Sequence, residues 1–197
     1  MKKNIVYIIT IVFLITGGWI IKNVVSENSD VAQDFPLESL NDVEKIENSK
    51  TYTSTTFGFD IQYPENWVVS SNEKEIGYNV SFSSISLTEP RIPSNETKIE
   101  IMILDNNEED DIGVWVEKFH TADQFANTPV GAVKSIIIAN KDSILEIINT
   151  AGNNYVVGYI PVTNNKVMMV TGPSVNHRYY KTYFQMLKTL RLNFERS

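Results

Sequence analysis

Residues 133–171 read VKSIIIANKDSILEIINTAGNNYVVGYIPVTNNKVMMVT, and this stretch decides the fold. It contains four runs rich in β-branched and aromatic residues, which favour strands. Short clusters of Asn, Asp, Lys and Gly separate the runs and are typical of tight turns. Strands joined by such short turns pair antiparallel, because a parallel crossover needs roughly a dozen residues. We therefore predict an antiparallel meander with strands at Val133–Ala139, Ser143–Thr150, Tyr155–Pro161 and Lys166–Thr171.

Strands are also predicted outside the meander. Lys98–Leu104 places its isoleucines on one side, with the period of two expected of a half-buried strand. Phe57–Tyr63 alternates in the same way and stops at Pro64, which cannot donate a hydrogen bond to a sheet. Further runs of this type are Thr51–Thr56, Asn66–Val69, Tyr78–Leu87 and Arg191–Phe194.

Two helices are predicted where the hydrophobic period changes. The first has apolar residues at positions i, i+3, i+4 and i+7, namely Ile112, Trp115, Val116 and Phe119. Asp110 or Asp111 is expected to cap its N-terminus. The second helix is predicted at about Val175–Leu190, where aromatic and leucine side chains form an apolar stripe. Strands, a helix, a meander and a final helix predict one α+β domain in which helices flank a large antiparallel sheet.

The first 25 residues, MKKNIVYIITIVFLITGGWIIKNVV, predict a transmembrane helix. Ile5–Ile21 carries no charge, and at ~1.5 Å per residue it is slightly short of a ~30 Å hydrocarbon core. Lys2 and Lys3 predict that the N-terminus lies inside and the rest outside. The alternative is a cleaved signal peptide with a weak site at Val24–Ser26, although the apolar run exceeds a signal core of roughly 7–15 residues. Both interpretations export the domain.

Residues 26–50 are predicted to form a spacer. The stretch is acidic, rich in Ser and Asn, and poor in large apolar residues, as flexible linkers are. A short helix at Leu37–Ile46 is the element that it could hold. The predicted organisation is an anchor or uncleaved signal at 1–25, an acidic flexible linker at 26–50 and an extracytoplasmic domain at 51–197.

The composition excludes several kinds of site. The 197 residues include no cysteine, which excludes disulfides, thiolate metal sites, cysteine nucleophiles and a lipidated cysteine. His120 and His177 are the only histidines, which excludes a histidine-rich metal centre. A net charge of −7 repels polyphosphate, so we expect no nucleic-acid partner.

No catalytic residue and no cofactor are predicted. The serines do not lie in a Gly-x-Ser-x-Gly turn, and the scattered glycines form no phosphate-binding loop. Neither histidine has an acid and a nucleophile near it in the sequence. An exported hydrolase remains an alternative, and it would require a cleft where His120 or His177 meets a carboxylate and a hydroxyl.

Residues 105–111, DNNEEDD, form the most suggestive polar cluster, because its carboxylates could bind Ca²⁺. The cluster fails as an EF-hand loop, since Asp110 stands where glycine is needed and Val116 where the bidentate glutamate is needed. We therefore predict a solvated loop that caps the next helix, and no metal site. The weak metal candidates are Asp105, Asn107, Glu109, Asp110 and Asp111.

The start of the domain resembles the PsbP-like family, which is named for an extrinsic subunit of photosystem II and shares the Mog1/PsbP fold. The resemblance rests on a Gly-Phe strand, a proline turn and a tryptophan at this spacing, followed by a tryptophan in the middle helix. The residues of this fold signature are Gly58, Phe59, Tyr63, Pro64, Trp67 and Trp115.

The resemblance implies an αβα sandwich around an antiparallel sheet, in an exported, non-enzymatic accessory protein. The chain departs from the cyanobacterial lipoproteins in having a peptide anchor and no cysteine. No residue is carried over for the calcium or chloride effects of the photosynthetic member, so we expect a non-photosynthetic member. Trp67, Trp115, Tyr63 and Tyr155 could line a ligand groove, but we expect them in the core.

The predicted function is therefore a membrane-anchored extracytoplasmic accessory module, attached through residues 5–21, whose partner is an unidentified protein or small ligand. The alternatives are an exported hydrolase with an unrecognised site and a calcium-binding accessory subunit of the PsbP type.

Overall fold

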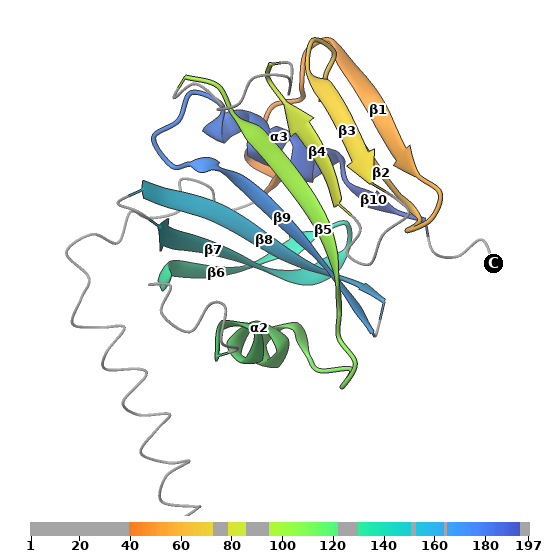
Figure 1. The fold of residues 1–197 in the computed structure, drawn as a ribbon, viewed down its shortest axis with the longest axis vertical. Coiled ribbons are helices and arrows are strands. Elements are labelled where there is room, and N and C mark those ends of the chain that lie inside the picture. The colour runs from red at the N-terminus through yellow and green to blue at the C-terminus, as the bar shows by residue number, and fades with distance from the viewer. Residues whose placement is uncertain are drawn as a thin grey trace, which may run out of the picture. The chain divides into compact units, whose positions relative to one another are not determined.

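The computed structural model describes residues 40–72, 79–85, 95–121, 130–150, 153–163 and 165–193 (Figure 1). All described elements belong to one compact unit, Phe35–Ser197. The predicted transmembrane segment lies outside the described residues. Among the residues that are described, no helix is both long enough and apolar enough to cross a membrane.

Within the described part of the chain, seven strands form the main sheet, in the order β3-β4-β5-β9-β8-β7-β6 (Figure 1). Every neighbouring pair is antiparallel. The predicted meander is confirmed as β6 (Val130–Ile138), β7 (Lys141–Thr150), β8 (Asn153–Thr163) and β9 (Lys166–Ser174). The remaining strands are β3 (Val68–Asn72), β4 (Asn79–Ser83) and β5 (Lys98–Asp105).

A two-residue turn connects β6 to β7. Ile138 pairs with Lys141, and the residues between them, Ala139 and Asn140, have φ angles of 51° and 61°. Positive φ at both positions is the type I′ geometry, whose twist matches that of the flanking strands. The turn therefore begins one residue earlier than the predicted Asn140–Asp142, and β6 ends at Ile138.

A smaller sheet contains β1 (Ser49–Ser54), β2 (Phe59–Pro64) and β10 (Arg191–Leu192), in the order β1-β2-β10. The connection from β1 to β2 passes through Gly58, whose φ of 56° suits glycine. The sequence predicted one large sheet, but the described residues of the domain form two. The division arises because β2 pairs with β1 and β10, whereas β3 turns away after Pro64 to pair with β4.

The folded unit begins before the predicted boundary at Thr51. A short 3-10 helix, η2, spans Leu40–Asp42, and β1 starts two residues before that boundary. The side chains of Leu40 and Val43 are only 7% and 4% exposed, because both pack into the main core. The predicted flexible linker is therefore wrong for residues 40–50, since these apolar side chains anchor the acidic stretch to the domain.

The two helices, α2 (Ile112–Thr121) and α3 (Tyr180–Thr189), cover opposite faces of the main sheet. Successive strand side chains point to opposite faces, and Tyr159 packs with α2 whereas its neighbour Ile160 packs with α3. Figure 1 shows the sheet between the two helices, with α3 near the small sheet. A helix on each side of an antiparallel sheet agrees with the predicted α+β architecture.

Helix α3 starts five residues later than the predicted Val175. Strand β9 continues through Pro173 to Ser174, and a turn follows in which His177 N–H donates to the Ser174 oxygen (2.9 Å). The Tyr180 N–H then donates to the His177 oxygen (2.9 Å), and regular helix begins. The sequence Gly-Pro-Ser suggested an earlier break because proline is uncommon inside strands.

Candidate functional site

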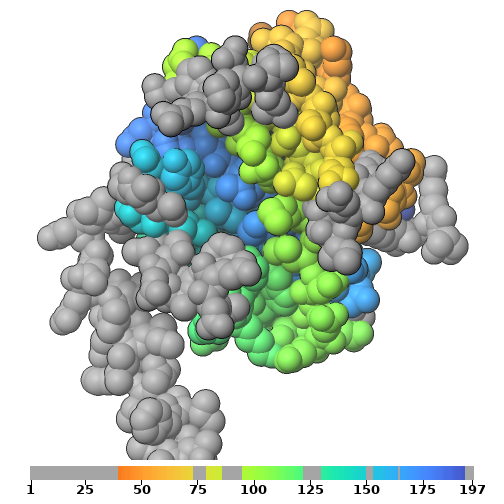
Figure 2. Space-filling model, in the orientation of Figure 1, coloured from red at the N-terminus to blue at the C-terminus, as the bar shows by residue number. Residues whose placement is uncertain are grey.

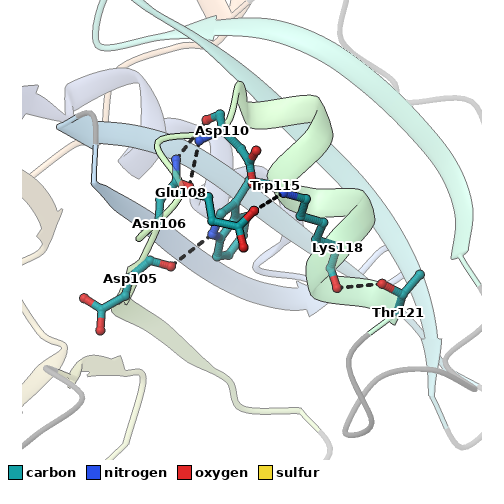
Figure 3. A network of polar contacts seen from close by, with 7 residues as sticks. All are labelled: Asp105, Asn106, Glu108, Asp110, Trp115, Lys118 and Thr121. Atoms are coloured by element: carbon teal, nitrogen blue, oxygen red, sulfur yellow. Dashed lines mark hydrogen bonds and ion pairs between the residues drawn. The ribbon is translucent and has the colours of Figure 1, made fainter.

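The polar loop between β5 and α2 is organised around Asn106 (Figure 3). The Asn106 side chain donates to the Asp110 carbonyl oxygen (2.8 Å) and accepts from the Asp110 N–H (3.0 Å). Its own backbone N–H donates to the Asn165 oxygen in the β8–β9 turn (2.8 Å). Asn106 is 4% exposed, so this loop closes around a buried amide and fixes the start of α2.

Two side chains of α2 tie the loop to the helix (Figure 3). Lys118 donates to the carboxylates of Asp110 (2.7 Å) and Glu108 (2.5 Å), and these hydrogen bonds raise the pKa of Lys118. The Trp115 indole N–H donates to the Asp105 carbonyl oxygen (3.0 Å). The acidic loop is therefore charge-paired with the helix that it caps.

The weak metal candidates do not converge on one point. Asp105 forms an ion pair with Lys166, and Asp110 forms one with Lys118. The backbone carbonyl oxygen of Asp111 accepts the Trp115 backbone N–H (2.9 Å), so Asp111 occupies the N-cap position that was one of the two predicted. Among the described residues, no group of three or more His, Asp or Glu side chains could hold a metal ion.

A second polar cluster, which sequence reasoning did not find, joins α2 to the sheet. His120 lies in the last turn of α2, and its Nε2 is 2.6 Å from Oε2 of Glu146 in β7. The two side chains are 15% and 4% exposed. Glu146 is the one charged residue that is buried in the described part of the chain. The available signal was a glutamate in the middle of the otherwise apolar run Ile144–Ile148.

Tyr159 of β8 completes this cluster. Its ring meets the imidazole of His120 edge-on, with centroids 6.2 Å apart. Burial, followed by the charge of Glu146, raises the pKa of Tyr159, so its hydroxyl stays protonated and is a weak nucleophile. No serine or threonine hydroxyl in the described residues hydrogen-bonds to His120. The cluster has the base and carboxylate of a triad without its nucleophile.

The other histidine lines an open groove. His177 Nδ1 accepts the Tyr179 N–H (3.2 Å), so the neutral ring carries its proton on Nε2, which is buried without a partner. The groove has a volume of about 420 Å³ and lies over β5, β9 and β8, which are side by side in Figure 2 as green, blue and cyan. Glu96 at its rim accepts from Arg178 (2.6 Å), and Tyr155 also lines it.

The fold-signature residues have structural positions. Phe59 is fully buried, and Trp67 is 5% exposed with its ring edge-on to Tyr179 at 5.2 Å. Trp115 is 7% exposed and stacks on Phe119 at 4.9 Å. The expectation of core aromatics is confirmed for both tryptophans, whereas Tyr155 lies in the groove of His177. Tyr63 is half-buried and packs on Phe82. Gly58 has a positive φ and lies in the turn between β1 and β2. Pro64 is the last residue of β2.

No protein-family model and no curated protein matches the chain. The fold is similar to the solution structure of cyanobacterial PsbP (CyanoP) from Synechocystis sp. PCC 6803, with a TM-score of 0.50 and 13% identity over 80% of this chain and 99% of that chain. A crystal structure from Bacteroides thetaiotaomicron VPI-5482 matches with a TM-score of 0.44 and 16% identity, over 77% of this chain and 51% of that one. At such low identity the likeness to CyanoP shows the fold alone. The domain therefore has a PsbP-like fold of mostly antiparallel sheet and two helices.

Proposed function

We propose that the chain is a membrane-anchored extracytoplasmic accessory module that binds a partner and does not catalyse a reaction. This proposal rests on the PsbP-like fold, because we expect a protein with such a fold to act as a binding module. The predicted anchor at residues 5–21 supports the location. The partner would be a protein or a small ligand.

The ion pairing and burial of the polar side chains support a non-catalytic role. The carboxylates of Asp105, Glu108 and Asp110 form ion pairs with lysines, and the His120–Glu146 pair lies between α2 and the sheet. The grooves of the described residues that include Asp110 or His177 do not include His120 or Glu146. The two side chains are only 15% and 4% exposed, so little of this pair is open to a substrate.

The proposal is tested in intact cells. Chemical crosslinking, detergent extraction and affinity capture of the tagged full-length chain should recover a stoichiometric partner. Protease added to the same cells should remove the domain if it lies outside the cytoplasm. Full protection from protease would refute the location, and recovery of the chain alone from crosslinked cells would count against a protein partner.

One observation favours the second candidate, an exported hydrolase. His120 does meet a carboxylate and lies beside a hydroxyl, as such an enzyme would require. If the pair were catalytic, activated esters would be hydrolysed by the wild type and not by a Glu146→Gln variant. We expect no hydrolysis above buffer by either protein, and a rate lost only in the variant would establish the enzyme.

A further inference from the structure

Strand β6 is an edge of the main sheet. In the described residues it pairs only with β7. The two-residue turn makes Ile138 and Lys141 a pair that exchanges both backbone hydrogen bonds. Hydrogen-bonded pairs alternate with open ones, so Ile137, Ser135 and Val133 direct their N–H and C=O groups away from β7. A further strand could pair with these groups.

The exposed side of β6 is unusually apolar for an edge. Val133 and Ile137 are 58% and 57% exposed, and Val130 is 39% exposed. Edge strands are normally protected by charges, prolines or bulges. β6 has one bulge between Val130 and Val133 and one charged residue, Lys134, but residues 135–138 have no such protection.

This edge opens into a groove with a volume of about 690 Å³. One wall is the end of β6 from Ser135 to Ile137, and the opposite wall is η2 with the C-terminal end of α3. The apolar part of the lining includes Leu187 and Leu190. Its charged lining residues are Lys188 and Arg191, and it has no acidic lining residue although the chain has a net charge of −7.

We propose that this surface, the β6 edge groove, binds an extended segment of a partner protein as an added strand. The segment would carry β-branched side chains, which suit an added strand, and a carboxylate near Lys188 and Arg191, the charged residues that line the groove. Side chains opposite Ile136 would point toward α3, and their neighbours would lie beside the exposed Val133 and Ile137. The inference rests on the proposed binding function and names its surface and partner chemistry.

In complexes where a partner adds a strand to a sheet edge, backbone pairing and pocket contacts make different contributions to binding. The main-chain hydrogen bonds supply affinity, and the pockets that receive alternate side chains supply specificity. A second copy of this chain suits the groove less well. A symmetric dimer would place the same patch on both sides, which would bring two sets of lysine and arginine side chains together.

The test uses the full-length chain in detergent and fluorescein-labelled peptides of nine residues, the length of β6. Valine and threonine alternate in each peptide, with a pair of glutamates at the N-terminus of one probe and the C-terminus of the other. A third peptide has lysines in place of the glutamates. Fluorescence anisotropy measures binding to the wild type, to Ser135→Pro and to Ser135→Thr.

Ser135→Pro removes an outward N–H without removing a bond to β7, and proline is tolerated on edge strands. Ser135→Thr keeps the N–H and is the matched control. We expect one glutamate probe to bind the wild type and Ser135→Thr, and the proline variant to bind it about tenfold more weakly at an unchanged melting temperature. The lysine peptide should bind about tenfold more weakly than its glutamate counterpart.

Equal binding by the wild type and Ser135→Pro, or no binding of either glutamate probe at millimolar concentration, would overturn the inference. A wild-type dimer that Ser135→Pro dissociates would show that a second copy occupies the edge, which also overturns it. The same variants separate this inference from the proposed function. If Ser135→Pro loses the peptide but still captures the crosslinked partner in cells, the module binds its partner through another surface.

Discussion

The close packing of Tyr183 against β9 predicts that enlarging the residue at position 172 lowers the stability of the domain. The Tyr183 ring is fully buried, and its hydroxyl donates to the Val170 carbonyl oxygen (2.9 Å). A Cβ atom added at Gly172 would lie 2.4 Å from Cδ2 and 2.7 Å from Cε2 of that ring. Gly172→Ala should therefore destabilise the domain, because the ring that docks α3 on the sheet would have to move.

The magnitude follows from the space around the ring. Carbon atoms make contact at about 3.5–4.0 Å, so the ring must shift by about 1 Å. Gly158 lies near the hydroxyl, where an added Cβ would be only 3.0 Å away, and the Phe184 ring is 5.2 Å from the Tyr183 ring. Overpacking costs about 1–3 kcal/mol, and a lost hydrogen bond adds about 1 kcal/mol. We expect the free energy of unfolding to fall by about 3 kcal/mol.

Urea denaturation of the Phe35–Ser197 unit measures this change. Gly113→Ala is the control, because nothing lies within 4 Å of its added Cβ, and in helix α2 it should stabilise by about 0.5–1 kcal/mol. In a Tyr183→Leu background the Gly172→Ala penalty should shrink, as a double-mutant cycle would show, but part of it should remain because the added Cβ also lies 2.8 Å from Cγ1 of Val156. A loss below about 0.5 kcal/mol for Gly172→Ala, or full additivity with Tyr183→Leu, would refute the reasoning.

Three further predictions concern the polar groups. His120→Ala should lower the free energy of unfolding by about 3 kcal/mol, because it leaves the buried Glu146 carboxylate without its partner, and Glu146→Gln in that background should recover part of the loss in urea titrations. The pKa of Glu96 is held below its ordinary 4.5, mainly by the Ser84 hydroxyl and also by Arg178. Its stabilising contribution is present above that pH and is lost on further acidification, so the melting temperature should fall less steeply below pH 4.5 in Glu96→Gln than in the wild type. Millimolar Ca²⁺ should leave the melting temperature unchanged, because Asp105, Glu108 and Asp110 of the loop are paired with lysines, and a clear rise would establish a calcium site.

The sequence by itself determined most of the local structure. Alternation with a period of two located the strands of the meander, and the i, i+3, i+4 pattern located α2, because these patterns reflect which side of one element is buried. Boundaries shifted where a turn or a strand end depends on its partner, as at the start of α3. The resemblance at Gly58–Trp67 also predicted the fold, since those residues make a turn and a core that the fold requires.

Only the tertiary structure decided the features that join distant residues. His120 and Glu146 are 26 positions apart, and no local pattern pairs a helical histidine with a strand glutamate. The sequence did not predict the burial of Leu40 and Val43, which lie in an acidic stretch, because their burial depends on packing in the core beside α3. The β6 edge groove likewise exists because strand order leaves β6 last in the sheet and places it opposite the end of α3. Periodicity reports which side of an element is buried, but the partner that buries it is chosen by the fold as a whole.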